Sequence, residues 1–126
     1  MSQDRREWRH SRGGMWFLEP ILLLLLHHGP AHGYILIDQL ALYELPGLHP
    51  SIVYRNLRSM EAKGWVTSSW DMGGGQGPPR RVYRLAPLGD EVLSAYVDDL
   101  EKAQARIADL VNAYHRHIEE GQGEYH

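Results

Sequence analysis

The sequence predicts a mainly α-helical protein with one small β-hairpin and a long C-terminal helix. Apolar residues recur at helical spacing in three segments between residues 16 and 63. Two short segments rich in aromatic and β-branched residues flank a Gly/Pro loop at 71–79. An apolar seven-residue repeat then runs from Leu93 to Tyr114. The 126 residues suffice for one domain with an extension.

Composition excludes several classes of protein. The chain has no cysteine, so it has neither disulfides nor thiolate metal sites. Its longest aliphatic run, Ile21–Leu26, is far shorter than the roughly 20 residues that a membrane-spanning helix needs. The sequence shows no signal-peptide pattern. We therefore expect a cytoplasmic protein with no membrane partner, and no motif predicts a cofactor.

The net charge of −3 hides a division along the chain. Residues 1–87 carry ten Lys or Arg and seven Asp or Glu, whereas residues 88–126 carry three and nine. The first part can therefore meet phosphates while the acidic part faces solvent or a partner chain.

The N-terminal segment divides into an arm and a helix. Residues 1–14 are polar and arginine-rich, which predicts a flexible basic arm. Residues 16–27 predict a helix that is buried on most of its circumference, with Pro20 in its first turn and Gly29-Pro30 ending it. We expect a second subunit to cover Trp16 and Phe17.

The next two helices are joined by a short turn. Residues 31–44 have helical apolar spacing, and Leu45-Pro46-Gly47 interrupts it. The third helix spans Leu48–Lys63, with Pro50 at its first helical position. Gly64 can adopt the left-handed backbone conformation that ends the helix. Two short helices with a glycine-containing turn form a helix-turn-helix.

The third helix separates its residue types by face. Its apolar stripe consists of Val53, Leu57 and Met60. Its polar face offers hydroxyls and guanidinium groups without a carboxylate: Ser51, Tyr54, Arg55 and Arg58. Such a face suits the major groove of DNA, where arginine bonds guanine edges or phosphates. The alternative is a solvated face that happens to lack acids.

A hairpin follows this helix. Residues 65–70 and 80–85 predict two paired strands joined by a flexible loop. Behind a helix-turn-helix such a hairpin is a wing, and Arg80 and Arg81 at its base are placed to touch backbone phosphates. The loop contains GGGQG but lacks the Lys-Ser ending of a nucleotide-binding loop.

The C-terminal segment predicts a helix from Leu88 to about Glu119, before a short tail at 121–126. Its seven-residue repeats comprise Leu93, Leu100, Ile107 and Tyr114, and Tyr96, Ala103 and Leu110. A helix this long needs another helix to cover it, most simply its twin, so we expect a homodimer. The alternative is a helix folded back onto its own domain.

The order of three motifs identifies a resemblance. HGY at 32–34, VYRNLRSMEAKGWV at 53–66 and PRRVYRLAPLGDEVL at 79–93 together resemble the PadR family of bacterial transcription regulators. The resemblance implies a winged helix-turn-helix, here residues 15–87. It also implies dimerisation through a C-terminal helix, here 88–120 in the short-tailed form, often with help from the first helix.

The resemblance also assigns roles to residues. It maps DNA binding onto Tyr54 and Arg55 in the third helix and onto Arg80 and Arg81 in the wing. Tyr34 is expected to pack the second helix, where a phosphate contact is within reach. The chain departs from the family at His49-Pro50-Ser51, where members often carry a small polar capping residue, so the cap of the third helix is open.

These observations predict a sequence-specific DNA-binding regulator, a homodimeric repressor acting on an inverted-repeat operator. One alternative is a sensor of an aromatic effector bound between subunits near Trp16, Phe17 and Tyr96. Another is a winged-helix module that binds protein. The eight histidines predict no metal site, since Gly29-Pro30 breaks the helix between His28 and His32. An enzyme is the weakest alternative, because no catalytic constellation occurs at a spacing that forms one cleft.

Overall fold

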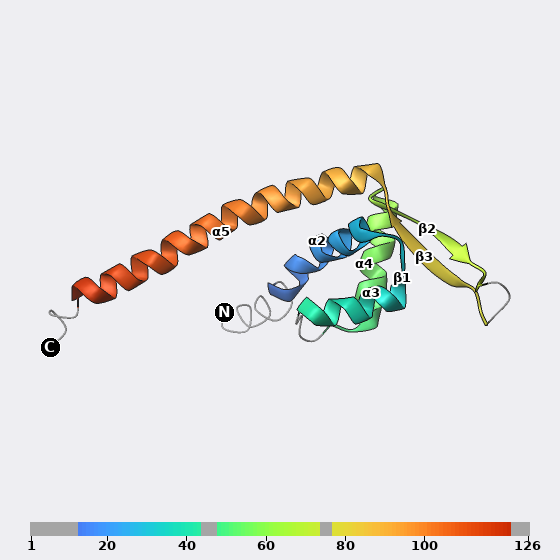
Figure 1. Ribbon diagram of the computed structural model, residues 1–126, viewed down its shortest axis with the longest axis horizontal. Helices are drawn as coiled ribbons and strands as arrows, with labels where there is room; N and C mark the ends of the chain where they lie inside the picture. Colours follow the sequence, from blue (N-terminus) through green and yellow to red (C-terminus); the bar gives the residue numbers. More distant parts are fainter. Residues whose placement is uncertain (1–12, 44–47, 74–76, 122–126) are drawn as a thin grey trace, which may run out of the picture. The chain divides into compact units, whose positions relative to one another are not determined.

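The computed structural model describes residues 13–43, 48–73 and 77–121, with side chains from Phe17 onward. The elements are helix α2 (Gly13–His28), strand β1 (Ala31–His32), helix α3 (Gly33–Leu40), the 3₁₀ turn η2 (Ala41–Tyr43), helix α4 (Pro50–Ala62), strands β2 (Val66–Asp71) and β3 (Arg80–Leu85), and helix α5 (Pro87–Gly121) (Figure 1). This confirms the predicted fold class. The chain forms two compact units, Met1–Leu93 and Ser94–His126.

Helix α2 supplies the largest share of the core. Leu18, Leu22 and Leu23 are fully buried, as the apolar run predicted. The helix begins at Gly13, inside the segment predicted as an arm, so Pro20 lies within the helix and the prediction of a first-turn proline is wrong. Residues 1–12 of the predicted arm lie outside the described part of the chain.

The predicted helix over 31–44 is wrong at its start. Ala31 and His32 form β1, which pairs antiparallel with β3 through Ala31↔Tyr83 and His32↔Val82. The sheet therefore has three strands in the order β1-β3-β2 rather than the predicted two. In a two-stranded hairpin the outer edge of β3 would leave its backbone groups unpaired; here β1 pairs with that edge, and local sequence does not reveal which segment will do so. The predicted turn at 45–47 falls outside the described residues.

Helix α4 begins with Pro50 at its first position, as predicted, and His49 answers the open question of its cap. The His49 Nδ1 accepts a hydrogen bond from the Ser51 backbone N–H at 3.3 Å. Val53, Leu57 and Met60 are buried, which confirms the apolar stripe. Gly64 then adopts φ +81°, the left-handed conformation expected after the helix.

Strands β2 and β3 pair antiparallel from Val66↔Leu85 to Asp71↔Arg80. Strand β2 begins and ends one residue later than predicted, whereas β3 has the predicted bounds. Val66 and Tyr83 are buried against the helices. We call β2, β3 and the loop between them the wing.

The first residues of α5 belong to the same unit as the sheet. Gly89 is buried, and a Cβ there would lie 2.0 Å from the Trp65 carbonyl oxygen. Leu93, predicted in the dimer seam, is already buried within the chain. In the second unit, α5 carries exposed apolar side chains at Ile107, Leu110, Val111, Tyr114 and Ile118. Among the described residues, no helix is long and apolar enough to cross a membrane.

Candidate nucleic-acid interface

The polar side of α4 exposes the predicted cations. Ser51, Arg55 and Arg58 are exposed, and neither arginine has a hydrogen bond or an ion pair with any residue that the structure describes. The prediction that this side lacks a carboxylate is wrong at its C-terminal end. Glu61 lies three residues beyond Arg58 and lines the same pocket, because one more helical step brings it to that side.

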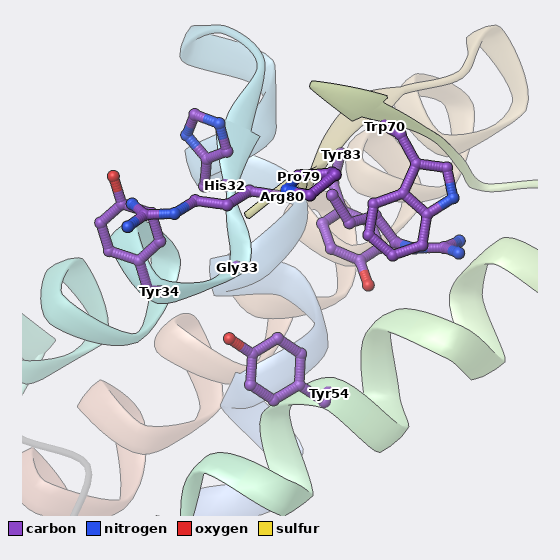
Figure 2. A pocket seen from close by; sticks show the side chains of 9 residues that line it. His32, Gly33, Tyr34, Tyr54, Trp70, Pro79, Arg80 and Tyr83 are labelled. Atoms are coloured by element: carbon purple, nitrogen blue, oxygen red, sulfur yellow. The ribbon is translucent and has the colours of Figure 1, made fainter. Parts of the chain in front are cut away.

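Tyr54 is half-buried rather than fully presented to solvent. Its ring packs over Gly33, where an added Cβ would lie 2.5 Å from the Tyr54 Cε1. Figure 2 shows Tyr54 rising from α4 toward the start of α3. The glycine of the HGY motif therefore allows the close crossing of α3 and α4, and the tyrosine hydroxyl also lies beside Gly33, 3.1 Å from the position of an added Cβ.

Two pockets lie between α4 and the wing. The first has a volume of about 470 Å³, and its lining includes His32, Tyr34, Trp70 and Arg80 (Figure 2). The second, of about 620 Å³, includes Arg58 and Glu61. Both pockets share three lining residues, Tyr54, Arg81 and Tyr83. They therefore adjoin and form a groove with aromatic walls and arginines from both sides.

Arg80 lies at one end of this groove. Its guanidinium carbon is 4.7 Å from the centre of the Tyr34 ring, which in turn stacks on His32 at 5.4 Å. The His32 Nε2 is 3.0 Å from the Asp71 Oδ2. A hydrogen bond from the Gly73 backbone N–H and the bond with His32 lower the pKa of the Asp71 carboxyl below its usual 3.8. The Tyr34 ring on α3 thus holds the Arg80 guanidinium by stacking against it.

Arg81 lies on the other side of β3 and is already engaged. Its Nη1 donates to the Ser68 Oγ at 2.8 Å and lies 3.8 Å from the Glu61 Oε1. The Ser68 hydroxyl donates to the Glu61 Oε2 at 2.7 Å. The guanidinium also lies 4.7 Å from the Trp70 ring centre. We call Glu61, Ser68, Trp70 and Arg81 the Arg81 cluster.

Tyr83 forms the floor of the groove. It is almost fully buried, and burial raises the pKa of its phenol above the usual 10.0. Arg81 lowers that pKa and Glu61 raises it, so both charges act on the same hydroxyl. The phenol is therefore neutral at physiological pH and acts as a packing group.

Sequence reasoning missed His32, Glu61 and Trp70 as parts of this site. Trp70 lies opposite Arg81 in the hairpin, which the alternation of residues would have shown had the register been known. Arg84 was also passed over, and its Nη1 donates to the Ser69 Oγ at 2.8 Å. His32 gives no local signal, since its place depends on the β1–β3 pairing.

The structure describes two of the three side chains expected around an aromatic effector. Phe17 is partly exposed on α2, Tyr96 is half-buried on α5, and the Trp16 side chain lies outside the described residues. Within the described ranges no group of three or more His, Cys, Asp or Glu side chains could hold a metal ion.

Residues 21–95 match the model of the transcriptional regulator PadR-like family. The chain belongs to the PadR-like family. As a PadR-like transcriptional regulator it is a DNA-binding protein, which confirms the predicted class of function. The matched family comprises transcriptional regulators rather than enzymes.

Solved structures resemble this PadR-like chain along most of its length. A conserved protein described as a potential transcriptional factor is 34% identical, with a TM-score of 0.73, over 82% of this chain and 92% of that one. A PadR family regulator from Eggerthella lenta is 26% identical, with a TM-score of 0.68, over 87% and 95%. One from Clostridium difficile shares the fold at 18% identity and a TM-score of 0.68, over 75% and 98%. None of the curated proteins matches the chain significantly.

Proposed function

We propose that this PadR-like protein is a homodimeric repressor that reads an inverted-repeat operator with α4 and holds the DNA backbone with residues of the groove. The observation that carries the proposal is the pair Arg55 and Arg58. Both are exposed on α4 without an acidic partner among the described residues. Unpaired guanidinium groups on one helix can form paired hydrogen bonds with guanine edges in the major groove.

The surrounding residues suit backbone contacts. Ser51 is exposed in the first turn of α4, and its hydroxyl, which lies 3.0 Å from the His49 Nδ1, can turn from that nitrogen to donate to a phosphate. Tyr34 and Tyr54 present phenols along the groove, and Arg80 is supported at its end by the Tyr34 ring. Phosphate contacts of this kind fix the register of the protein on the duplex, whereas Arg55 and Arg58 would carry sequence information.

The second unit supports the homodimer. Ile107, Leu110, Tyr114 and Ile118 recur at three- and four-residue steps and are exposed to solvent in one chain. An apolar stripe of this length on one helix is stabilised by a matching stripe on a second copy. Leu110→Glu should therefore convert the protein to a monomer in sedimentation velocity, and a dimer unchanged by Leu110→Glu would contradict this interface.

The DNA-binding proposal is tested by fluorescence anisotropy on duplex selected by the protein from random DNA. Arg55→Ala should raise Kd about 10- to 100-fold, the loss expected for one bidentate base contact. Arg106→Ala removes the same charge from an exposed position of α5 and is the matched control. Equal affinity of the wild type for selected and scrambled duplex would overturn sequence-specific repression.

An aromatic effector is the second candidate function, favoured by the partly exposed Phe17 ring on α2. If effector binding involves this ring, the fluorescence gain of an anilinonaphthalene dye should be lost in Phe17→Ala. Binding of the dye should also release DNA. A dye signal that is independent of Phe17, or a ternary complex with DNA of unchanged affinity, would contradict this site.

A further inference from the structure

The two neighbouring arginines of the wing have different surroundings. Side chains alternate along a strand, so Arg80 and Arg81 leave β3 on opposite sides. Arg80 lies over the Tyr34 ring, and the Asp71 carboxylate opposite it in the hairpin acts on it only electrostatically, since no residue that the structure describes forms a hydrogen bond or ion pair with Arg80. Arg81 faces α4 and contacts both a serine and a carboxylate. Sequence reasoning treated the pair as equivalent phosphate contacts.

We propose that Arg81 is a positioning residue, which fixes the wing against α4 through the Arg81 cluster, and that Arg80 is the arginine of the wing that contacts a DNA phosphate. The inference rests on the proposed function, since it assigns roles within the same interface. It adds Glu61, Ser68 and Trp70 as residues that act on DNA binding through the position of the wing.

The hydrogen bonds of the Arg81 cluster join three elements. Glu61 belongs to the last turn of α4, Ser68 to β2 and Arg81 to β3. The Ser68 hydroxyl donates to Glu61 at 2.7 Å and accepts from Arg81 at 2.8 Å. One serine oxygen thus links the helix to both strands. Loss of Glu61, Ser68 or Arg81 removes a connection between α4 and the wing.

The charges of the cluster argue against a phosphate contact by Arg81. Its guanidinium lies 3.8 Å from the Glu61 carboxylate, which repels a phosphate approaching the same point. Trp70 covers one face of the guanidinium, whose side chain is 41% exposed. Arg81 also compensates the charge of Glu61 on the side of α4 that carries Arg55 and Arg58, so its pairing favours DNA without a direct contact.

The salt dependence of binding separates the two roles. Each phosphate contact contributes about 0.9 to the slope of log K against log salt concentration. Arg80→Gln should lower that slope by about 0.9, and Arg80→Lys should restore most of it because lysine keeps the charge. Ser68→Ala changes no charge; it should weaken binding about 3- to 10-fold and leave the slope unchanged.

The matched control for Ser68→Ala is Ser69→Ala, which removes the neighbouring hydroxyl that accepts from Arg84. It should leave DNA affinity within about 2-fold of the wild type. Arg81→Lys should weaken binding as Ser68→Ala does, because a lysine cannot bond the serine and stack on Trp70 in the same geometry. A slope lowered by about 0.9 in Arg81→Gln and restored in Arg81→Lys would overturn the proposal.

A measurement on the free protein distinguishes failure of this inference from failure of the proposed function. Hydrogen exchange of the β2 amides should accelerate in Ser68→Ala and Arg81→Lys but not in Arg80→Gln. Unchanged exchange in both cluster variants would overturn the positioning role even where DNA binding is normal. If the wild type binds no duplex, the proposed function fails, and exchange alone decides whether the cluster holds the wing.

Discussion

Helix α4 and the wing both carry arginines, but the arginines of the two regions have different surroundings. Arg55 and Arg58 on α4 have no hydrogen-bond or ion-pair partner within the described residues. In the wing, Arg80 stacks on Tyr34, Arg81 bonds Ser68, and Arg84 bonds Ser69. A helix held by buried side chains can leave its cations to a ligand, whereas the strands of a hairpin, marginal by themselves, use long side chains such as those of Arg81 and Arg84 for their own stability.

The largest expected effect comes from a substitution that disturbs both α4 and the wing. Gly89→Ala would place a Cβ 2.0 Å from the Trp65 carbonyl oxygen, next to the end of α4 and the start of β2. Since the obstacle is backbone, we expect the free energy of unfolding to fall by about 3 kcal/mol. Urea denaturation measures it. Gly29→Ala, where an added Cβ meets nothing within 4 Å, is the control, and equal stability of the two variants would contradict the packing at Gly89.

A smaller change breaks the α4 side alone. Gly33→Ala would place a Cβ 2.5 Å from the Tyr54 Cε1, but the tyrosine ring can turn away. We expect a loss of about 1–2 kcal/mol in unfolding free energy. DNA affinity should also fall, since Tyr54 lies in the groove. The double variant Gly33→Ala/Tyr54→Ala should lose less unfolding free energy than the sum of the two single losses, because the added methyl group then meets no ring. Strict additivity of the two losses would argue against the contact.

The wing side can be broken alone through Asp71. Its pKa is lowered in the folded protein by Gly73 and His32, so its contribution to stability is full above the unfolded value of about 3.8. The contribution is lost as pH falls through the lower folded value. Asp71→Asn should therefore lower Tm near neutral pH, and the Tm difference from the wild type should shrink in acid. A difference that persists unchanged below pH 3 would contradict the role of the charge.

The smallest expected effect concerns Tyr83, which lies between the two regions. Because burial raises its pKa, the folded state favours the neutral phenol. Its contribution is full below the unfolded pKa of about 10.0 and is lost as pH rises through the higher folded value. In an ultraviolet titration, the difference in absorbance between the wild type and Tyr83→Phe should show a tyrosine that ionises above the usual pKa of 10.0. An ionisation at or below it would show that Tyr83 is accessible.

Much of the fold and part of the site could be predicted from the sequence. Pro50 and Gly64 mark the bounds of α4, and Val53, Leu57 and Met60 give its buried side. These features depend on neighbours three or four residues apart, which the printed order shows directly. The exposure of Arg55 and Arg58 follows from the same spacing, and the order of the HGY, α4 and wing motifs indicated the PadR-like family.

Only the tertiary structure decided what surrounds those residues. The pairing of β1 with β3, the contact of Tyr54 with Gly33 and the bonding of Arg81 to Ser68 and Glu61 join segments that are not neighbours in sequence. Each depends on strand register and on how helices cross, which loop length and packing set together. The sequence therefore determined which groups the interface carries, and the fold determined which of them are left available to DNA.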